Sequence, residues 1–346
     1  MKFKPTVLVT GAGSFCAINI IKSLRLVKKY KIISTDIFPE SVGAFCSDIS
    51  YIVPREGKDG KFIDKLLYIC KKDKVSIIIP GFDSEIPYIF DAKKDFEAIG
   101  TKVLIGNSLL NDIGWDKYKL SIFLYENKFP YLKSFELINA EKALEELSFP
   151  CVLKPKSGWS QRGFSILNNS IDYHYVINKI SDPENYMIQE FIDDKEGEFT
   201  NTVSVAIDGD ILGCICMKRQ LVKGDSRLIT VDEYPNLSKQ MTSIAKKINS
   251  PGPINLQCRL KNGIAYVFEI NPRFSTTNSV RAAFGYNEVE LLVDHFISGK
   301  KKYINNYKKK YTAMVYLNYA FIESKSIEQF YNKKSTVLNA DTEKAI

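Results

Sequence analysis

The residues of this 346-residue chain that are best suited to chemistry lie at 254–273, in the segment INLQCRLKNGIAYVFEINPR. Two apolar stretches are joined at Asn262-Gly263, a strong two-residue signal for a β-hairpin. Such a hairpin puts Gln257 on one strand and Glu269 on the other, with Asn271 two residues further along the same face. Three oxygen-bearing side chains can therefore converge on one point.

A set of oxygen ligands with one carboxylate suits Mg²⁺, with Mn²⁺ as an alternative, because Mg²⁺ keeps its waters and completes its shell with substrate phosphates. Arg273 follows on the same face if the strand continues past Pro272, and its guanidinium can pair with phosphoryl oxygens. The competing interpretation is a polar hairpin face in water. A Glu and an Asn inside the apolar run AYVFEIN are costly without partners, which favours the metal site.

The elements that must position this hairpin fall into two patterns. In the first hundred residues, apolar strands alternate with amphipathic helices, which predicts an α/β domain with an open parallel sheet. From about Asp112, runs of strands with helices between them predict an α+β fold. We expect strands at 6–10, 31–36, 75–80, 102–106, 151–156, 163–168, 186–192, 198–208, 210–221, 254–263, 264–270 and 313–322, and a short segment that ends with YIVP at 51–54. We expect helices at 17–26, 61–72, 117–126, 140–147, 237–247 and 288–297, one after Asp83 and a short one near the C-terminus.

Composition narrows the class of protein. The chain is 45% hydrophobic and 25% charged, which is ordinary for a folded globular protein and argues against disorder. It lacks a run of 18 apolar residues and an N-terminal signal pattern, so we expect a cytoplasmic protein without a membrane partner. Seven cysteines and two histidines, without metal-ligand spacing, predict neither a zinc site nor a disulfide framework.

The net charge of +8 is spread along the chain except at 300–310, where KKKYINNYKKK gathers six lysines. This run can contact nucleic acid or an acidic surface. The interpretation that we prefer is a solvated basic segment, so nucleic acid is not the expected partner.

A glycine loop follows the first predicted strand. Gly11 and Gly13 lie between a strand and a helix, where backbone N–H groups favour an anion, and Asp36 ends the next strand. Cys16 stands where a dinucleotide-binding turn would have its third glycine. Three interpretations stay open: a tight turn without a ligand, a nicotinamide cofactor site, and a substrate-side role.

The segment from 254 to 299, with its Gln, hairpin, Glu-x-Asn-Pro-Arg and following helix, resembles the ATP-grasp half-site of carbamoyl phosphate synthetase large subunits. The resemblance covers roughly residues 5 to 300. It implies an open α/β domain before the ATP-grasp fold at 1–110 and an ATP-grasp domain at 111–300. Within the latter it implies a lid subdomain at about 115–190 and a C-terminal subdomain at about 191–300, which leaves 301–346 as an extension of unknown role.

The resemblance also implies roles for single residues. Lys117 looks like the basic residue that contacts the nucleotide, and Lys154 like the strand lysine that reaches the α and β phosphates. A lysine in an apolar strand before a glycine-containing loop is also well placed beside phosphate; a lysine that snorkels at a sheet edge is the alternative. The loop 157–163 would be a lid over the phosphates, with contacts from Gly158, Arg162 and Gly163.

The segment MIQEFID resembles the hinge strand whose backbone binds adenine, with its residues at the sheet edge: Gln189, Glu190, Phe191 and Ile192. Glu198 looks like the carboxylate for the ribose hydroxyls or a substrate group, against the alternative of a solvated loop carboxylate. For an anionic substrate, the candidates are Ser275 and Arg281 after the hairpin, and Arg219 one strand away.

The resemblance implies chemistry in which the γ-phosphoryl group of ATP passes to a carboxylate and an amine attacks the acyl phosphate. Lys154, Asn271 and Arg273 are the expected catalytic residues, since such a site need only align groups and neutralise charge. The chain corresponds to one half of a synthetase large chain, so we expect a stand-alone ligase that joins a small carboxylate to an amine, and we expect these substrates to be amino-acid-like. A homodimer is compatible with this.

Two other classes stay open. A nucleotide-binding protein that tailors a carrier or polymer, without its own ligase activity, would use the basic run at 300–310 as its partner surface. A nicotinamide oxidoreductase would rest on Gly11, Gly13 and Asp36 and would leave the hairpin residues unexplained.

Overall fold

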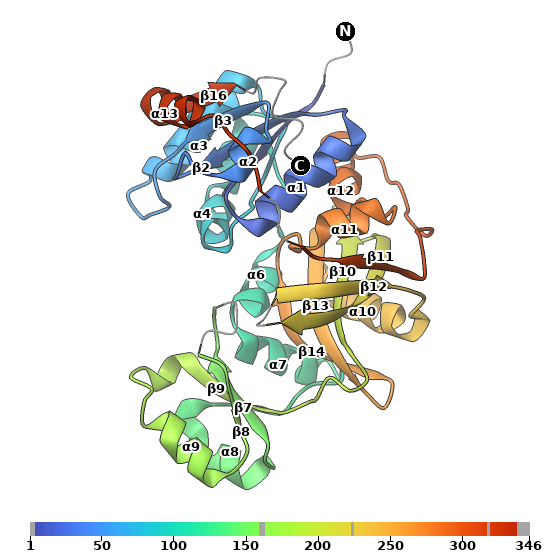
Figure 1. Cartoon of the computed structure of the whole chain (residues 1–346). Helices are drawn as coiled ribbons and strands as arrows, with labels where there is room; N and C mark the ends of the chain where they lie inside the picture. Colours follow the sequence, from blue (N-terminus) through green and yellow to red (C-terminus); the bar gives the residue numbers. More distant parts are fainter. Residues whose placement is uncertain (1–3, 159–162, 223–224, 317–318, 338–346) are drawn as a thin grey trace.

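The computed structural model describes residues 4–158, 163–222, 225–316 and 319–337. Its strands form three sheets, and Figure 1 shows them as an N-terminal α/β unit, a small separate unit in green and a larger sheet in yellow and orange. No helix in these described ranges is both long and apolar enough to cross a membrane.

The N-terminal sheet has the strand order β16-β3-β2-β1-β4-β5. Its strands are β1 (Thr6–Val9), β2 (Lys31–Asp36), β3 (Ile49–Ile52), β4 (Ile77–Ile79), β5 (Lys102–Val103) and β16 (Ser335–Val337). Its helices are α1 (Phe15–Val27), α2 (Val42–Phe45), α3 (Lys61–Asp73), α4 (Ile86–Asp91) and α5 (Lys93–Ala98). The five strands β1 to β5 pair in parallel, so the predicted parallel sheet is confirmed.

The second sheet, which we call the lid sheet, is antiparallel with the order β6-β9-β7-β8. Its strands are β6 (Ser134–Glu136), β7 (Cys151–Pro155), β8 (Ser165–Leu167) and β9 (Tyr186–Glu190). The helices α8 (Ala140–Glu146) and α9 (Ser170–Ile177) flank it. Leu153, Ile188 and Tyr173 belong to a small apolar core of its own. Helix α9 was not predicted, because its sequence SIDYHYVI lacks a clear apolar face.

The third sheet, called the large sheet below, is antiparallel with the order β14-β13-β10-β11-β12-β15. Its strands are β10 (Glu198–Val205), β11 (Ile211–Val222), β12 (Asp225–Val231), β13 (Gly252–Lys261), β14 (Ile264–Asn271) and β15 (Tyr311–Met314). The sequence analysis missed β12, whose alternation in DSRLITV is interrupted by the adjacent Leu228 and Ile229.

Six further helices surround these sheets: α6 (Ser108–Trp115), α7 (Lys117–Glu126), α10 (Pro235–Ile248), α11 (Asn278–Ala283), α12 (Glu288–Ser298) and α13 (Ser324–Lys333). Apolar residues of α6, α7 and α10 pack on one face of the large sheet. Its other face carries the polar residues described below. Helix α7 begins as predicted at Lys117, because the Asp116 carboxylate accepts hydrogen bonds from the N–H groups of Tyr118 and Lys119.

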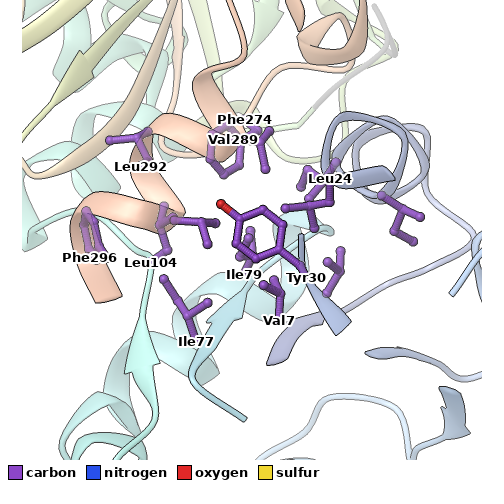
Figure 2. Close-up of a cluster of buried hydrophobic side chains, with 14 of the residues drawn as sticks. Val7, Leu24, Tyr30, Ile77, Ile79, Leu104, Phe274, Val289, Leu292 and Phe296 are labelled. Atoms are coloured by element: carbon purple, nitrogen blue, oxygen red, sulfur yellow. The ribbon is translucent and has the colours of Figure 1, made fainter. Parts of the chain in front are cut away.

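The core of the N-terminal unit continues into the second half of the chain. Val7, Ile77 and Ile79 of the parallel sheet belong to one buried cluster with Val289 and Leu292 of α12. Figure 2 shows these side chains around the ring of Tyr30. The boundary that we predicted near residue 110 therefore separates two sheets but not two independent cores.

The C-terminal residues join both large units of the fold. Strand β15 adds to the edge of the large sheet beside β12, and β16 then pairs antiparallel with β3 in the N-terminal sheet. Phe330 of α13 is fully buried against Phe45, with ring centroids 6.1 Å apart. In Figure 1 this red segment lies beside β3. Within the extension predicted at 301–346, β16 thus covers the β3 edge, and the N-terminal sheet is mixed rather than wholly parallel.

Candidate functional site

The predicted hairpin is present. Asn262 and Gly263 both have positive φ, at 54° and 72°, as a tight two-residue hairpin requires. The register of β13 and β14 sets Gln257 opposite Glu269 and Asn255 opposite Asn271. Local turn chemistry thus aligns the polar residues of two strands.

Glu269 is the centre of a small polar cluster. Its Oε1 accepts one hydrogen bond from Nε2 of Gln257 at 3.1 Å and another from Nδ2 of Asn271 at 3.0 Å. The three side chains predicted to converge therefore meet. Their role as metal ligands remains a prediction, and no group of three His, Cys, Asp or Glu forms an alternative metal site in the described part of the chain.

A β-bulge next to this cluster brings in a residue that the sequence analysis missed. Gln257 pairs with Glu269 but Cys258 pairs with Val267, which leaves Phe268 as the extra residue. Its ring centroid lies 6.0 Å from Nζ of Lys154 and 5.9 Å from Cζ of Arg259. Phe268 therefore lies beside two cations close to Glu269, and simple strand alternation could not have revealed this.

Lys154 reaches toward the large sheet from β7 of the lid sheet. Its Nζ donates to Oε1 of Gln189 at 2.8 Å, and the side chain is 8% exposed, so it does not snorkel into water. Burial is the main cause that lowers the pKa of Lys154 to about 7; the charges of Lys117 and Arg259 act in the same direction, and that of Glu269 opposes them. A buried lysine without a carboxylate partner is poised to accept an anion.

Gln189 supports Lys154. The prediction that Gln189 lies at a sheet edge is wrong. Strand β9 has hydrogen-bonded neighbours on both sides, β6 and β7, and Nε2 of Gln189 donates to Oγ of Ser134. Glu190 lies next to it at the end of β9, 3.8 Å from Nζ of Lys261. Phe191 and Ile192 follow in the connection to the large sheet.

Glu198 is held by two arginines at the start of β10. Its Oε1 accepts from Nε and Nη2 of Arg219, and its Oε2 accepts from Nε of Arg259 at 2.8 Å. Arg219 also donates to Oε1 of Gln257 at 2.6 Å, and Arg259 donates to the carbonyl of Ile192 at 2.7 Å. Glu198 is therefore a buried, fully paired carboxylate and not a solvated loop residue. The sequence analysis missed Arg259, although its position two residues after Gln257 indicates that it lies on the same face of the strand.

Arg273 turns toward the N-terminal unit. It forms a bidentate ion pair with Asp83, which begins a short turn of 3₁₀-helix at Asp83–Glu85, and it donates to the carbonyl of Phe274. Burial disfavours its charge, but Asp83 outweighs this and raises the pKa of Arg273. Arg273 thus does not continue the face of Glu269 and Asn271, because Pro272 ends the strand.

Arg281 is not available to a substrate in this structure, contrary to our expectation. Its side chain is completely buried, and it donates to Glu288 at 2.7 Å, to Asn255 at 3.0 Å and to Thr200 at 3.2 Å. Ser275 is also buried and shares a hydrogen bond with Thr277. A guanidinium in an apolar interior needs such partners, so Arg281 joins α11 to α12 and the large sheet.

In the glycine loop, a side chain of the protein itself takes the place of a bound anion. Gly13 donates its N–H to Oδ2 of Asp36 at 2.6 Å, while Oδ1 accepts from the N–H of Phe38. Gly11 has a φ of 62°, and a Cβ there would lie 2.7 Å from Cβ of Phe82. The loop is therefore a tight turn in which Asp36 acts as an internal acceptor.

The predicted lid loop is described only at its two ends. Nζ of Lys117 donates to the carbonyl of Gly158 at 2.8 Å, which links α7 to the loop. Gly163 has a φ of 73°, and a Cβ there would lie 2.7 Å from the hydroxyl of Tyr186. Arg162 and the rest of 159–162 lie outside the described residues.

Two family models match the sequence. Residues 7–104 match the PylC-like N-terminal domain, and residues 183–318 match a model described as ATP-grasp in the biosynthetic pathway with Ter operon. The carbamoyl phosphate synthase large chain of Thermoanaerobacter sp. (strain X514) is 26% identical over 331 residues, which cover 86% of this chain and 29% of that protein. The chain thus spans less than a third of the length of this relative.

Solved structures match across most of the chain. The N5-carboxyaminoimidazole synthetase of Staphylococcus aureus aligns with a TM-score of 0.71 and 16% identity, covering 96% of this chain and 86% of that one. The biotin carboxylase domain of the Hydrogenobacter thermophilus 2-oxoglutarate carboxylase, in complex with MgADP, ADP and bicarbonate, aligns with a TM-score of 0.68 and 15% identity. It covers 89% of this chain and 72% of that one. These matches confirm the predicted fold, an open-sheet α/β unit followed by an α+β unit.

Proposed function

We propose that this chain, which belongs to the ATP-grasp superfamily, is an ADP-forming ligase that activates a carboxylate as an acyl phosphate and joins it to an amine. One observation carries the proposal. Glu269, flanked by the amides of Gln257 and Asn271 on the large sheet, faces the buried Lys154 of the lid sheet. A carboxylate and, on the opposing sheet, a lysine without a carboxylate partner among the described residues suit a polyphosphate that carries a metal.

The residues present fit Mg²⁺, with Mn²⁺ as the alternative. Oε2 of Glu269 and Oδ1 of Asn271 accept no hydrogen bond from the described residues, so two hard oxygen atoms are available on neighbouring side chains. Gln257 would be the third ligand through Oε1, once this atom is released from Arg219. Bound there, the cation would neutralise phosphate oxygens of the nucleotide. The MgADP in the related carboxylase domain is consistent with this choice.

We assign the remaining residues as follows. Lys154 and Lys117 bind phosphate oxygens of ATP, and the loop from Gly158 to Gly163, with Arg162, covers them. The segment from Gln189 to Ile192 binds adenine, and Glu198 orients the ribose side of the site through its two arginines. Once Arg273 is released from its ion pair with Asp83, it stabilises the phosphoryl group. Gly11, Gly13, Arg219 and Ser275 remain candidates for substrate contacts.

The proposed reaction has two steps. A carboxylate oxygen attacks the γ-phosphorus of ATP, the bond to the β-phosphate oxygen breaks, and ADP leaves. The nitrogen of a neutral amine then attacks the acyl carbon, and phosphate leaves with the bonding electron pair while the amine loses its proton to water. The protein needs no covalent nucleophile, because the positive charge of Lys154 stabilises both leaving groups, and a bound cation would add to this charge.

The test is a screen for ADP release with Mg-ATP, in which small carboxylates are crossed with amines. We expect one pair to give stoichiometric ADP, phosphate and amide product. The Glu269→Gln variant should give none of these. If wild-type protein binds no Mg-ATP, or if ADP forms equally without a carboxylate, the proposal is wrong.

We also propose that the chain forms a homodimer, because the related carboxylase domain was crystallised as one. Sedimentation over a range of concentrations tests this. A single monomeric species throughout would contradict it.

A further inference from the structure

A cavity of about 350 Å³ lies between the N-terminal unit and α6, next to the metal-binding hairpin. One wall comes from α4 and the turn before it, and the other from α6 and the start of α7. Asn271 and Pro272 line it at the end of β14, and Gly158 lines it at the edge of the lid loop. The cavity therefore opens beside a residue that we assign to the metal site.

The lining carries an excess of negative charge. Four carboxylates, those of Asp83, Asp91, Asp112 and Asp116, face a single ammonium group, that of Lys119. Asp83 is neutralised by Arg273, and Asp116 caps α7. Asp112 lies 4.0 Å from Lys119, and Asp91 has no ion pair within the described ranges. The negative charge that is not neutralised favours a bound cation and would repel a carboxylate substrate.

An unsatisfied amide gives a second, independent indication of a ligand. Nδ2 and Oδ1 of Asn111 are both buried, and neither has a hydrogen-bond partner among the described residues. Asn111 lines the cavity. An unpaired buried polar atom costs about 1–3 kcal/mol. Once the Asn111 amide rotates toward the cavity, a ligand that presents a donor and an acceptor side by side would relieve two such costs.

Most of the remaining lining is apolar. Ile86, Phe90, Trp115 and Pro272 face the cavity, and Trp115 is 47% exposed. An indole face attracts cations as well as apolar groups. The cavity thus combines an acidic rim, an apolar wall and one amide without hydrogen-bond partners among the described residues.

We propose that this cavity binds the amine co-substrate, and that this substrate is a small cationic amine with an apolar body and an amide or amino-acid-like group. The assignment as co-substrate rests on the proposed ligase function, but the binding site does not. Its position beside Asn271 places the amine next to the proposed acyl phosphate, and its charge separates amine from carboxylate. The ammonium group gives one proton to water before its nitrogen attacks.

The experiment measures binding without nucleotide in the full chain. The probes are phenylalaninamide, which is cationic, 3-phenylpropanamide, which lacks only the amine, and 3-phenylpropanoate, which is anionic. Trp115 is the reporter in a Trp159→Phe background, because the sequence has only these two tryptophans. We expect a saturable fluorescence change with phenylalaninamide, binding about tenfold weaker with the neutral amide, and none with the anion.

Variants test the residues that carry the inference. Asp91→Asn should weaken phenylalaninamide binding by about fivefold to tenfold and leave 3-phenylpropanamide unchanged. Asn111→Leu should weaken both amides. Asp95→Asn, an exposed carboxylate on α5 outside the cavity, is the matched control and should change neither. Circular dichroism and calorimetry check the folding of both variants. If Asn111→Leu misfolds, Asp91→Asn still tests the proposal, because Asp91 is exposed.

The outcomes separate this proposal from the proposed function. Equal binding of the three probes, no saturation up to about 10 mM, or no effect of Asp91→Asn would overturn the cavity as an amine site. Carboxylate-dependent ADP release could still be observed then. Conversely, charge-selective binding in a protein that never releases ADP would overturn the role of the amine as co-substrate.

Discussion

Arg273 and Asp83, 190 residues apart, form a bidentate ion pair with Nε–Oδ1 at 2.5 Å and Nη2–Oδ2 at 2.8 Å. Their side chains are 13% and 22% exposed. The pair ties the end of β14 to the N-terminal unit and holds a guanidinium that we assign to the phosphoryl group. Asp83 therefore both stabilises the interface and competes with phosphate for Arg273.

We predict that Asp83→Asn lowers the free energy of unfolding by about 1–3 kcal/mol, because it leaves a largely buried guanidinium without its counter-charge. Urea unfolding measures this. A double-mutant cycle with Arg273→Gln should give a coupling of about 1 kcal/mol or more. Glu97→Gln, which removes an exposed pair with Lys93, is the control and should cost less than about 0.5 kcal/mol. A coupling near zero would show that the pair contributes no stability.

We predict that Glu269→Gln lowers Mg²⁺-dependent ATP turnover by about a hundredfold or more while the fold stays intact. A neutral amide is a weaker ligand for a hard dication than a carboxylate. The measurement is ADP release over a Mg²⁺ titration, with circular dichroism as the check on folding. Glu145→Gln, an exposed change on α8, should leave turnover unaffected. Near-normal turnover of Glu269→Gln at limiting Mg²⁺ would rule out the metal assignment.

For Lys154→Met we predict loss of ATP affinity by about 2–4 kcal/mol, because a nearly buried charge partner of the phosphates disappears. The pKa of Lys154 is about 7, so much of it is neutral at pH 8 and must regain a proton when an anion binds. Calorimetry at pH 8 in buffers of different ionisation enthalpy should therefore show uptake of nearly one proton, and Lys154→Met should abolish it. Uptake that persisted in this variant would assign the proton to another group. The exposed Lys71→Met is the control.

The lowered pKa of Lys154 also predicts how the free energy of unfolding depends on pH when no nucleotide is bound. Because the pKa of Lys154 in the folded protein lies below its ordinary value of 10.5, the unfolded chain holds more protons between about pH 7 and 10.5. Burying Lys154 thus costs stability below pH 7, and the cost fades as pH rises toward 10.5. Lys154→Met should be more stable than wild type at pH 7, and the two should converge by about pH 10. A difference that is constant with pH would contradict the shift.

Gly114 gives a prediction about packing. A Cβ on Gly114 of α6 would lie 2.8 Å from Cδ of Pro272, a ring atom that cannot rotate away. We predict that Gly114→Ala destabilises the protein by about 1–3 kcal/mol, because α6 or the segment Asn271–Pro272 must move. Thermal unfolding measures this, and turnover should fall as Asn271 shifts. Gly57→Ala, where the nearest atom is 3.7 Å from the added Cβ, is the control; equal effects of the two changes would contradict the steric argument.

Some parts of this site could be predicted because they depend on residues close in sequence. The Asn262-Gly263 turn sets the register that brings Gln257 opposite Glu269, and the cap at Asp116 begins α7 at Lys117. Strand alternation and helix periodicity likewise predicted most elements and the order of α/β and α+β parts. Turn geometry, capping and side-chain periodicity act over a few residues, so they can be read without knowledge of the fold.

Other features depended on contacts between distant segments. The ion pair of Arg273 with Asp83, the burial of Arg281 beside Glu288, the return of β16 to β3 and the cavity around Asn111 all join elements from separate parts of the chain. An arginine has the same local signature whether it meets a phosphate or an aspartate. Which partner it meets is decided by the packing of whole helices and sheets, because only that packing determines which side chains lose water and which charges lie within reach.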